Sequence, residues 1–403
     1  MSALKDSAIY LVGEIFSKIF PFLLVPYLSR KLGVEGYGEL SYYQTYIALF
    51  IVLFSMAQEG AVTRYFYFYG KNSLNLIVNT GYSYTLTIST IFLIINLCFF
   101  KSTILLYAIL AAVFEIFVTV QLTIRQCQKK AIEYTTIKIL SGVISVLITI
   151  FMLEFFKTDL VKKRILAILV TNILIFLISY TLYKNEIKNK KFSFYHYKKA
   201  LLYLLNLGFP MIFHHMSFYI KGQVDRIFIY HKFSEVDLGL YAMGANLATV
   251  LMVLINAVNK ATLPYYYEGI KLNRITIKRV HRWFFLSLIF PFIVSMIAFL
   301  IPENIIVWIL GHQFVGTKYY IVIFVFSIGL AVPYAILVNY LFYYGKNKII
   351  AFCSIASTII YLLGLVGLTF TKIEYVPYAS VLAAITILPF LFFMTKKVNI
   401  DKD

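Results

Sequence analysis

The stretch of sequence that decides the fold is ILAILVTNILIFLISYTLY, which runs from Ile165 to Tyr183. It contains no Asp, Glu, Lys or Arg, and a basic residue stands at each of its ends, Arg164 and Lys184. A helix needs about 20 mostly apolar residues to cross the hydrocarbon core of a bilayer. This stretch therefore predicts a membrane-spanning helix.

Stretches of the same kind recur along the whole chain, with short connections between them. Together with Ile165–Tyr183 they make twelve candidate spans: Ser7–Ser29, Leu40–Val62, Leu74–Phe100, Thr103–Thr123, Ile137–Phe156, Leu201–Tyr219, Leu240–Leu263, Trp283–Ile301, Tyr319–Leu341, Ile349–Phe370 and Val376–Thr395. The sequence therefore predicts an all-α integral membrane protein with twelve transmembrane helices, and no connection is long enough for a soluble domain.

The composition excludes other classes of protein. Of the 403 residues, 61% are apolar and 14% are charged, whereas a soluble chain has about 45–50% apolar and about 25% charged residues. The net charge of +19 does not indicate a nucleic-acid partner, because the basic residues fall between apolar runs. Their distribution places both termini in the cytoplasm. The three cysteines show neither disulfide nor metal-site spacing, and no cofactor or metal is expected.

The chain also resembles itself when it is shifted by half its length. Tyr37-Gly38 then meets Leu238-Gly239, and Tyr65 meets Tyr266. The shift preserves the direction across the membrane, so it predicts a parallel repeat of two six-helix bundles, at residues 1–190 and 191–403. In such transporters the substrate site lies at the repeat interface, where a central cleft is expected.

Two motifs carry a resemblance to a known family. Residues 30–38, RKLGVEGYG, resemble the R-x-L-G-x-E-x-Y-G signature of the polysaccharide-transporter family, which includes the O-antigen flippases (Wzx). Residues 225–241 resemble the exit of that family's seventh span, an Asp followed by an apolar run and G-x-Y, with Leu238 as a departure. The span number and the chain length agree with the same family over the whole chain.

The resemblance implies a fold, a location and an activity. It implies a V of two bundles in the bacterial inner membrane, as in the multidrug/oligosaccharidyl-lipid/polysaccharide exporter superfamily. It also implies a flippase, and not an enzyme, that moves undecaprenyl-diphosphate-linked oligosaccharide repeat units to the outer leaflet for O-antigen assembly. The polysaccharide polymerase machinery would then be a partner. In the first motif, Gly33, Gly36 and Gly38 predict a tight turn that shapes the chain and does not touch substrate.

Ionisable side chains inside predicted spans are the candidates for a transport site, because charge is costly at membrane depth. Their basic members would bind a diphosphate. The candidates are Glu14, Lys18, Arg64, Arg125, His215, Lys221, Asp225, Arg226 and Lys260. Glu14 and Lys18 share one helix face and lie deepest, so this pair is the first choice. For the others, structural ion pairs and side chains that reach the headgroups remain alternatives.

Two alternatives to the flippase remain open on the sequence alone. An ion-coupled multidrug exporter of the same superfamily would need buried acids, whereas the membrane-depth charges here are mainly basic. A membrane glycan polymerase or ligase would need a large outer loop, and no catalytic motif such as G-x-S-x-G or H-E-x-x-H occurs. The coupling ion, H⁺ or Na⁺, stays undecided; His214-His215 would serve H⁺, with only one ring facing the cleft.

Overall fold

The structure is a computed structural model that describes residues 2–184 and 192–400, without the side chains of residues 2–12, 14, 15, 17, 18, 72, 184, 347 and 398–400. Its described residues form helices and short connections, with no strand among them. The α-helices are α1 Ser2–Ser55, α2 Gln58–Tyr69, α3 Leu74–Ile95, α4 Thr103–Cys127, α5 Ala131–Phe155, α6 Leu160–Lys184, α7 Phe194–Lys232, α8 Glu235–Lys271, α9 Ile277–Ser287, α10 Phe290–Leu300, α11 Glu303–Leu310, α12 Thr317–Gly329, α13 Ala331–Tyr343, α14 Asn347–Thr369 and α15 Tyr378–Ile400. The predicted all-α membrane architecture is confirmed.

The contacts divide the chain into two compact units, residues 1–219 and 220–403. The boundary falls inside α7, after Tyr219. The predicted halves, 1–190 and 191–403, meet before α7 begins, and that division stays a prediction.

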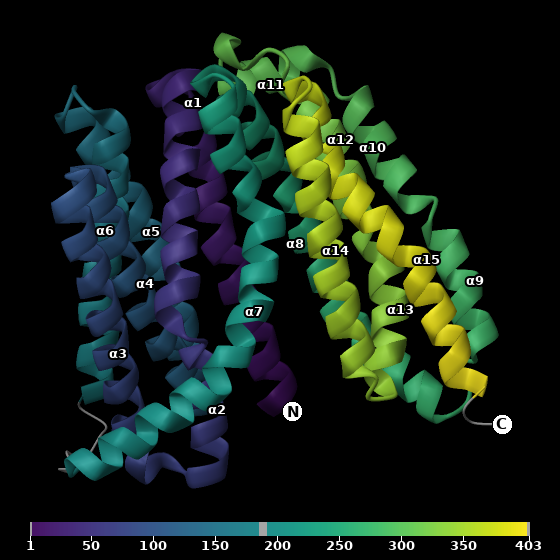
Figure 1. Ribbon diagram of the computed structural model, residues 1–403, viewed down its shortest axis with the longest axis horizontal. Helices are drawn as coiled ribbons and strands as arrows, with labels where there is room; N and C mark the ends of the chain where they lie inside the picture. Colours follow the sequence, from purple (N-terminus) through teal and green to yellow (C-terminus); the bar gives the residue numbers. More distant parts are fainter. Residues whose placement is uncertain (1, 185–191, 401–403) are drawn as a thin grey trace. The chain divides into compact units, whose positions relative to one another are not determined.

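In the first unit, α1 contains two of the predicted spans. The chain leaves the helical conformation at Gly33, whose φ of 70° lies in the left-handed region. It reverses direction there, since Figure 1 shows the N-terminus and α2 toward the same end of the unit. Gly36 and Gly38 are helical, so the prediction that all three glycines form the turn is wrong for these two. One residue without a Cβ is enough for the reversal.

The described residues contain eleven helical segments that are long and apolar enough to span a membrane. The first of them, Ile19–Tyr69, includes both predicted spans that flank Gly33, so the prediction of twelve separate spans and the observed helices differ only in how α1 is divided. Large apolar side chains such as Phe99, Trp308 and Leu363 are at least 70% exposed. Lipid tails cover such surfaces at no hydrophobic cost, and we conclude that this is a multi-pass membrane protein.

Each unit has its own apolar core. In the first unit, α2, α3 and α4 pack together through Val62, Ile77 and Ile124, and the beginning of α7 joins them through Leu204. In the second unit the core includes Val280 of α9, Leu337 of α13 and Leu391 of α15.

Candidate functional site

The end of α1 and the start of α2 form a break inside the first unit. Met56 and Ala57 both have a positive φ, 46° and 50°, which is costly for residues with a Cβ. Hydrogen bonds to α3 offset the cost of this backbone conformation. The buried Gln58 side chain donates to the Gly81 carbonyl at 3.1 Å and to Thr85 at 2.7 Å. Thr85 in turn donates to the Phe54 carbonyl at 3.1 Å. These contacts hold a non-helical segment in place within Ile19–Tyr69, which is long and apolar enough to span a membrane.

Helix α7 comes close to this break at Gly208. A Cβ at Gly208 would overlap the carbonyl oxygen of Met56, which is backbone and cannot move aside. Pro210 follows inside the helix and removes one backbone hydrogen bond. Figure 1 shows α7 bent rather than straight, and we attribute the bend to this proline.

Replacing Gly208 with Ala should therefore destabilise the protein on the order of 2 kcal/mol, because overpacking against backbone is not relieved by a rotamer change. Gly222 lies in the same helix, and a Cβ added there would meet no atom within 4 Å. Gly222→Ala is therefore the matched control and should be neutral or slightly stabilising. Thermal unfolding of the two purified variants measures the difference. Equal melting temperatures would show that the close approach at Gly208 does not exist.

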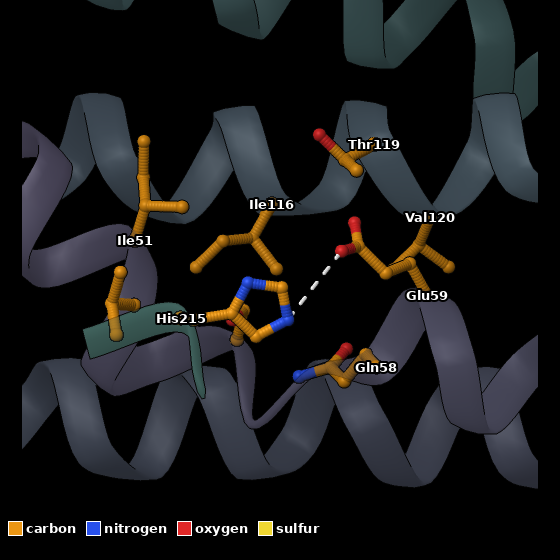
Figure 2. A pocket seen from close by; sticks show the side chains of 9 residues that line it. Ile51, Gln58, Glu59, Ile116, Thr119, Val120 and His215 are labelled. Carbon is orange, nitrogen blue, oxygen red and sulfur yellow. Dashed lines mark ion pairs between the residues drawn. The ribbon is translucent and has the colours of Figure 1, made fainter. Parts of the chain in front are cut away.

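A small cavity of about 80 Å³ lies beside the break. It is lined by Ile51, Val52, Ser55, Gln58, Glu59, Ile116, Thr119, Val120 and His215. Figure 2 shows the His215 ring of α7 directed toward the Glu59 carboxylate of α2, with 4.0 Å between His215 Nε2 and Glu59 Oε1. Both side chains are partly exposed, 34% and 47%. The two side chains form an ion pair when the imidazole is protonated.

Arg125, at the end of α4, is completely buried and surrounded by protein partners. Its Nε lies 3.1 Å from the Glu133 carboxylate at the start of α5. Its two terminal nitrogens donate to Gln121 at 3.3 Å and to the Ser179 carbonyl of α6 at 2.9 Å. Arg125 therefore joins three helices, which is the structural ion pair that the sequence left as an alternative to substrate binding.

A second buried polar cluster lies in the second unit. Asp225 and Arg226 on α7 are each 6% exposed. The Asp225 carboxylate accepts hydrogen bonds from the Tyr241 hydroxyl of α8 and from the Arg226 amide at 2.9 Å. The Arg226 guanidinium donates to Gln223 and, at 3.2 Å, to Asn246 of α8. The two ends of the 225–241 motif thus contact each other and fasten α7 to α8.

The remaining predicted site residues are distributed differently. Arg64 is exposed, with its guanidinium 5.3 Å from the centre of the Phe68 ring. Lys260 is exposed and Lys221 is half-buried. The side chains of Glu14 and Lys18 lie outside the described residues, so this pair stays a prediction.

Two further charged groups with partners on another helix were not singled out from the sequence. Arg164 appears in the sequence as the end of a basic run, yet it is only 7% exposed and donates to Thr149 of α5 at 2.6 Å. Glu133 appears as an ordinary first-turn acid, yet it neutralises Arg125. No spacing rule reveals either contact, because each joins residues of two different helices.

The comparisons with known proteins agree on family and fold. Residues 3–269 match the model of a family described as polysaccharide biosynthesis protein. The chain is 55% identical over 399 residues to "Lsg locus putative protein 1" of Haemophilus influenzae, with 99% of each chain covered. Among solved structures, it is similar to the lipid II flippase MurJ, with a TM-score of 0.76, 14% identity, and 96% and 87% of the two chains covered.

The fold is also similar to that of a MATE transporter. A mutant of the Vibrio cholerae MATE transporter VcmN matches with a TM-score of 0.65 and 12% identity, over 98% of this chain and 96% of that one. These neighbours are transporters and a flippase, and the fold is the one shared by transporters of their superfamily.

Proposed function

The chain belongs to the polysaccharide biosynthesis protein family, and from this premise we propose that it is a flippase for undecaprenyl-diphosphate-linked oligosaccharide repeat units. It moves them from the cytoplasmic to the outer leaflet of the bacterial inner membrane for the assembly of O-antigen or another surface polysaccharide. The family match carries the proposal, because it relates a chain with a transporter fold to polysaccharide synthesis. The similarity to a flippase for another lipid-linked sugar, lipid II, supports it.

The charge of the chain fits an anionic cargo. A lipid diphosphate carries about two negative charges, and Arg and Lys are the side chains that bind its oxygens. Exposed Arg64 and Lys260, half-buried Lys221 and the predicted Lys18 are the candidates, since the described partners of Arg125 and Arg226 already engage those two side chains. We propose alternating access along a path lined by these cations, with the prenyl tail remaining in lipid and both termini in the cytoplasm.

Deletion of the gene in a glycan-producing host tests this function. The expected result is an accumulation of unpolymerised lipid-linked repeat units on the inner leaflet and a loss of surface glycan. The chain restored on a plasmid is the control. Unchanged surface glycan would contradict the flippase, and unchanged glycan together with new sensitivity to cationic drugs would favour the multidrug exporter that the MATE similarity supports.

Lys18 gives a narrower test of the cationic path. Lys18→Ala should lower glycan export about tenfold, since one charge-assisted contact to a phosphate is lost, whereas Lys18→Arg should keep most of it. Lys31→Ala is the matched control on α1, because Lys31 pairs with Glu154 at 2.8 Å. Export is measured as surface glycan at equal protein level. Normal export by Lys18→Ala would remove Lys18 from the path.

A further inference from the structure

We propose that His215 and Glu59 form a proton-binding site whose occupancy fastens α7 to the start of α2. The two side chains come from different helices, face each other at 4.0 Å and line one cavity of about 80 Å³ (Figure 2). Neither side chain is sealed from its surroundings, so a proton can reach the pair. This proposal rests on the flippase function for its consequence, which is that proton binding controls a step of transport.

The backbone beside the pair is held in a strained conformation. Glu59 stands in the first turn of α2, where the helix dipole attracts negative charge. Directly before it, Met56 and Ala57 hold the left-handed conformation described above. Such strained segments persist only while their surroundings hold them, and they occur at switch regions.

Helix α7 meets this segment at two points that differ in chemistry. At Gly208 the contact is steric and independent of pH, because it joins backbone to backbone. About two turns further along α7, the contact through His215 depends on protonation. Pro210 lies between them and weakens the helix there. Loss of the second contact therefore leaves the first in place and lets α7 move about its bend.

Among the residues that line the cavity, His215 and Glu59 are the two with titratable side chains. The other lining residues, from α1, α2 and α4, do not titrate in the physiological range. Nearby charged or titratable groups belong to other contacts: Glu115 of α4 interacts with Lys138 and Asn172, Arg64 of α2 lies over Phe68, and His214 of α7 is exposed with its ring against Phe218. His214 is thus the natural control for His215.

The sign of the pH dependence follows from the charges. An imidazole carries a positive charge at low pH and attracts the carboxylate. In base an imidazole is neutral, so both the charge and the attraction are absent. The contact between α7 and α2 is therefore tighter in acid than in base.

Amide hydrogen exchange of the purified full chain in lipid nanodiscs tests the site. Exchange is followed for residues 51–60 and 208–216 at about pH 5.5 and about pH 8, after correction for the intrinsic pH dependence of exchange. Protection should be about threefold to fivefold greater at the lower pH, the size expected of a partly exposed ion pair. His215→Gln and Glu59→Gln should each abolish the difference, and the double variant should add nothing further. His214→Gln should retain it.

The outcomes separate this inference from the flippase function. A pH difference that persists in His215→Gln, or that is absent from the wild-type chain, overturns the proton site. Export of glycan is scored independently in the deletion strain. If His215→Gln restores export in the deletion strain and keeps the wild-type pH difference in hydrogen exchange, the result contradicts the site and supports the flippase. An exchange difference in a chain that restores no glycan supports the site and contradicts the flippase.

Discussion

The free energy of unfolding of the variant Arg125→Met is expected to be about 3 kcal/mol lower than that of the wild type, because two buried hydrogen-bond acceptors lose their charged donor. The methionine fills much of the space but leaves the Gln121 amide oxygen and the Ser179 carbonyl without their donor. The Glu133 carboxylate loses its contact with Arg125 and keeps the one with Lys130 at 2.9 Å. Since Arg125 joins α4, α5 and α6, we expect the loss of folded protein to exceed any selective effect on transport.

Arg64→Met is the control for this variant, because Arg64 is an exposed arginine of the same unit. Melting temperatures of both variants, measured by size-exclusion chromatography of heated samples in detergent, give the comparison. Arg64→Met should remain within about 0.5 kcal/mol of the wild type. If Arg125→Met melted like Arg64→Met, then Arg125 would not hold the first unit together.

The second large effect is expected at the cluster of the second unit. Tyr241→Phe removes the hydroxyl that donates to the buried Asp225 carboxylate. A hydrogen bond to a buried charge is worth about 1.5–3 kcal/mol, so unfolding should become easier by about 2 kcal/mol. The variant with both changes, Tyr241→Phe and Asp225→Asn, should lose less than the sum of the two single losses, since the carboxylate charge is then gone.

Tyr265→Phe is the matched control on α8, because its side chain is 76% exposed. Thermal unfolding in the same detergent should not separate it from the wild type. A Tyr241→Phe variant as stable as Tyr265→Phe would show that the Asp225–Tyr241 contact contributes nothing to the second unit.

The fold could be predicted from the sequence because a bilayer restricts spanning segments to long apolar helices. Apolar length alone identifies a spanning helix, and the predicted spans lie mainly in helices, although Leu40–Val62 contains the break at Met56 and Ala57. Finer features needed coordinates. Gly33 and Gly36 are both glycines in one motif, yet only Gly33 adopts positive φ, since packing decides which residue of a turn carries the reversal.

The candidate site could be predicted only as a set of residue types. The sequence placed charges inside spans, but their partners lie on other helices: Glu133 beside Arg125, Tyr241 beside Asp225, and Glu59 beside His215. Helical spacing predicts contacts within one helix and does not predict contacts between helices. The 225–241 motif illustrates this, because its two ends meet through the turn at Ser234, whose side chain caps α8.

These contacts give the charged residues two separate tasks. Charges that face protein partners, such as Arg125 and Asp225, stabilise each unit at the ends of its helices. Charges with exposed side chains, such as Arg64 and Lys260, are the ones that we propose to contact the anionic headgroup. The proposed flippase needs both kinds, since it must remain folded while it admits a headgroup with about two negative charges.

The movement of a lipid-linked sugar between leaflets tests the central claim most directly. The purified chain is reconstituted into vesicles that contain a radiolabelled undecaprenyl-diphosphate-linked repeat unit in both leaflets, and a membrane-impermeant hydrolase is added outside. In empty vesicles only the outer half of the lipid is cleaved. Vesicles with the wild-type chain should lose nearly all of it, and those with Lys18→Ala should lose the inner half about tenfold more slowly. Cleavage that stops at half in the presence of folded wild-type protein would contradict the account.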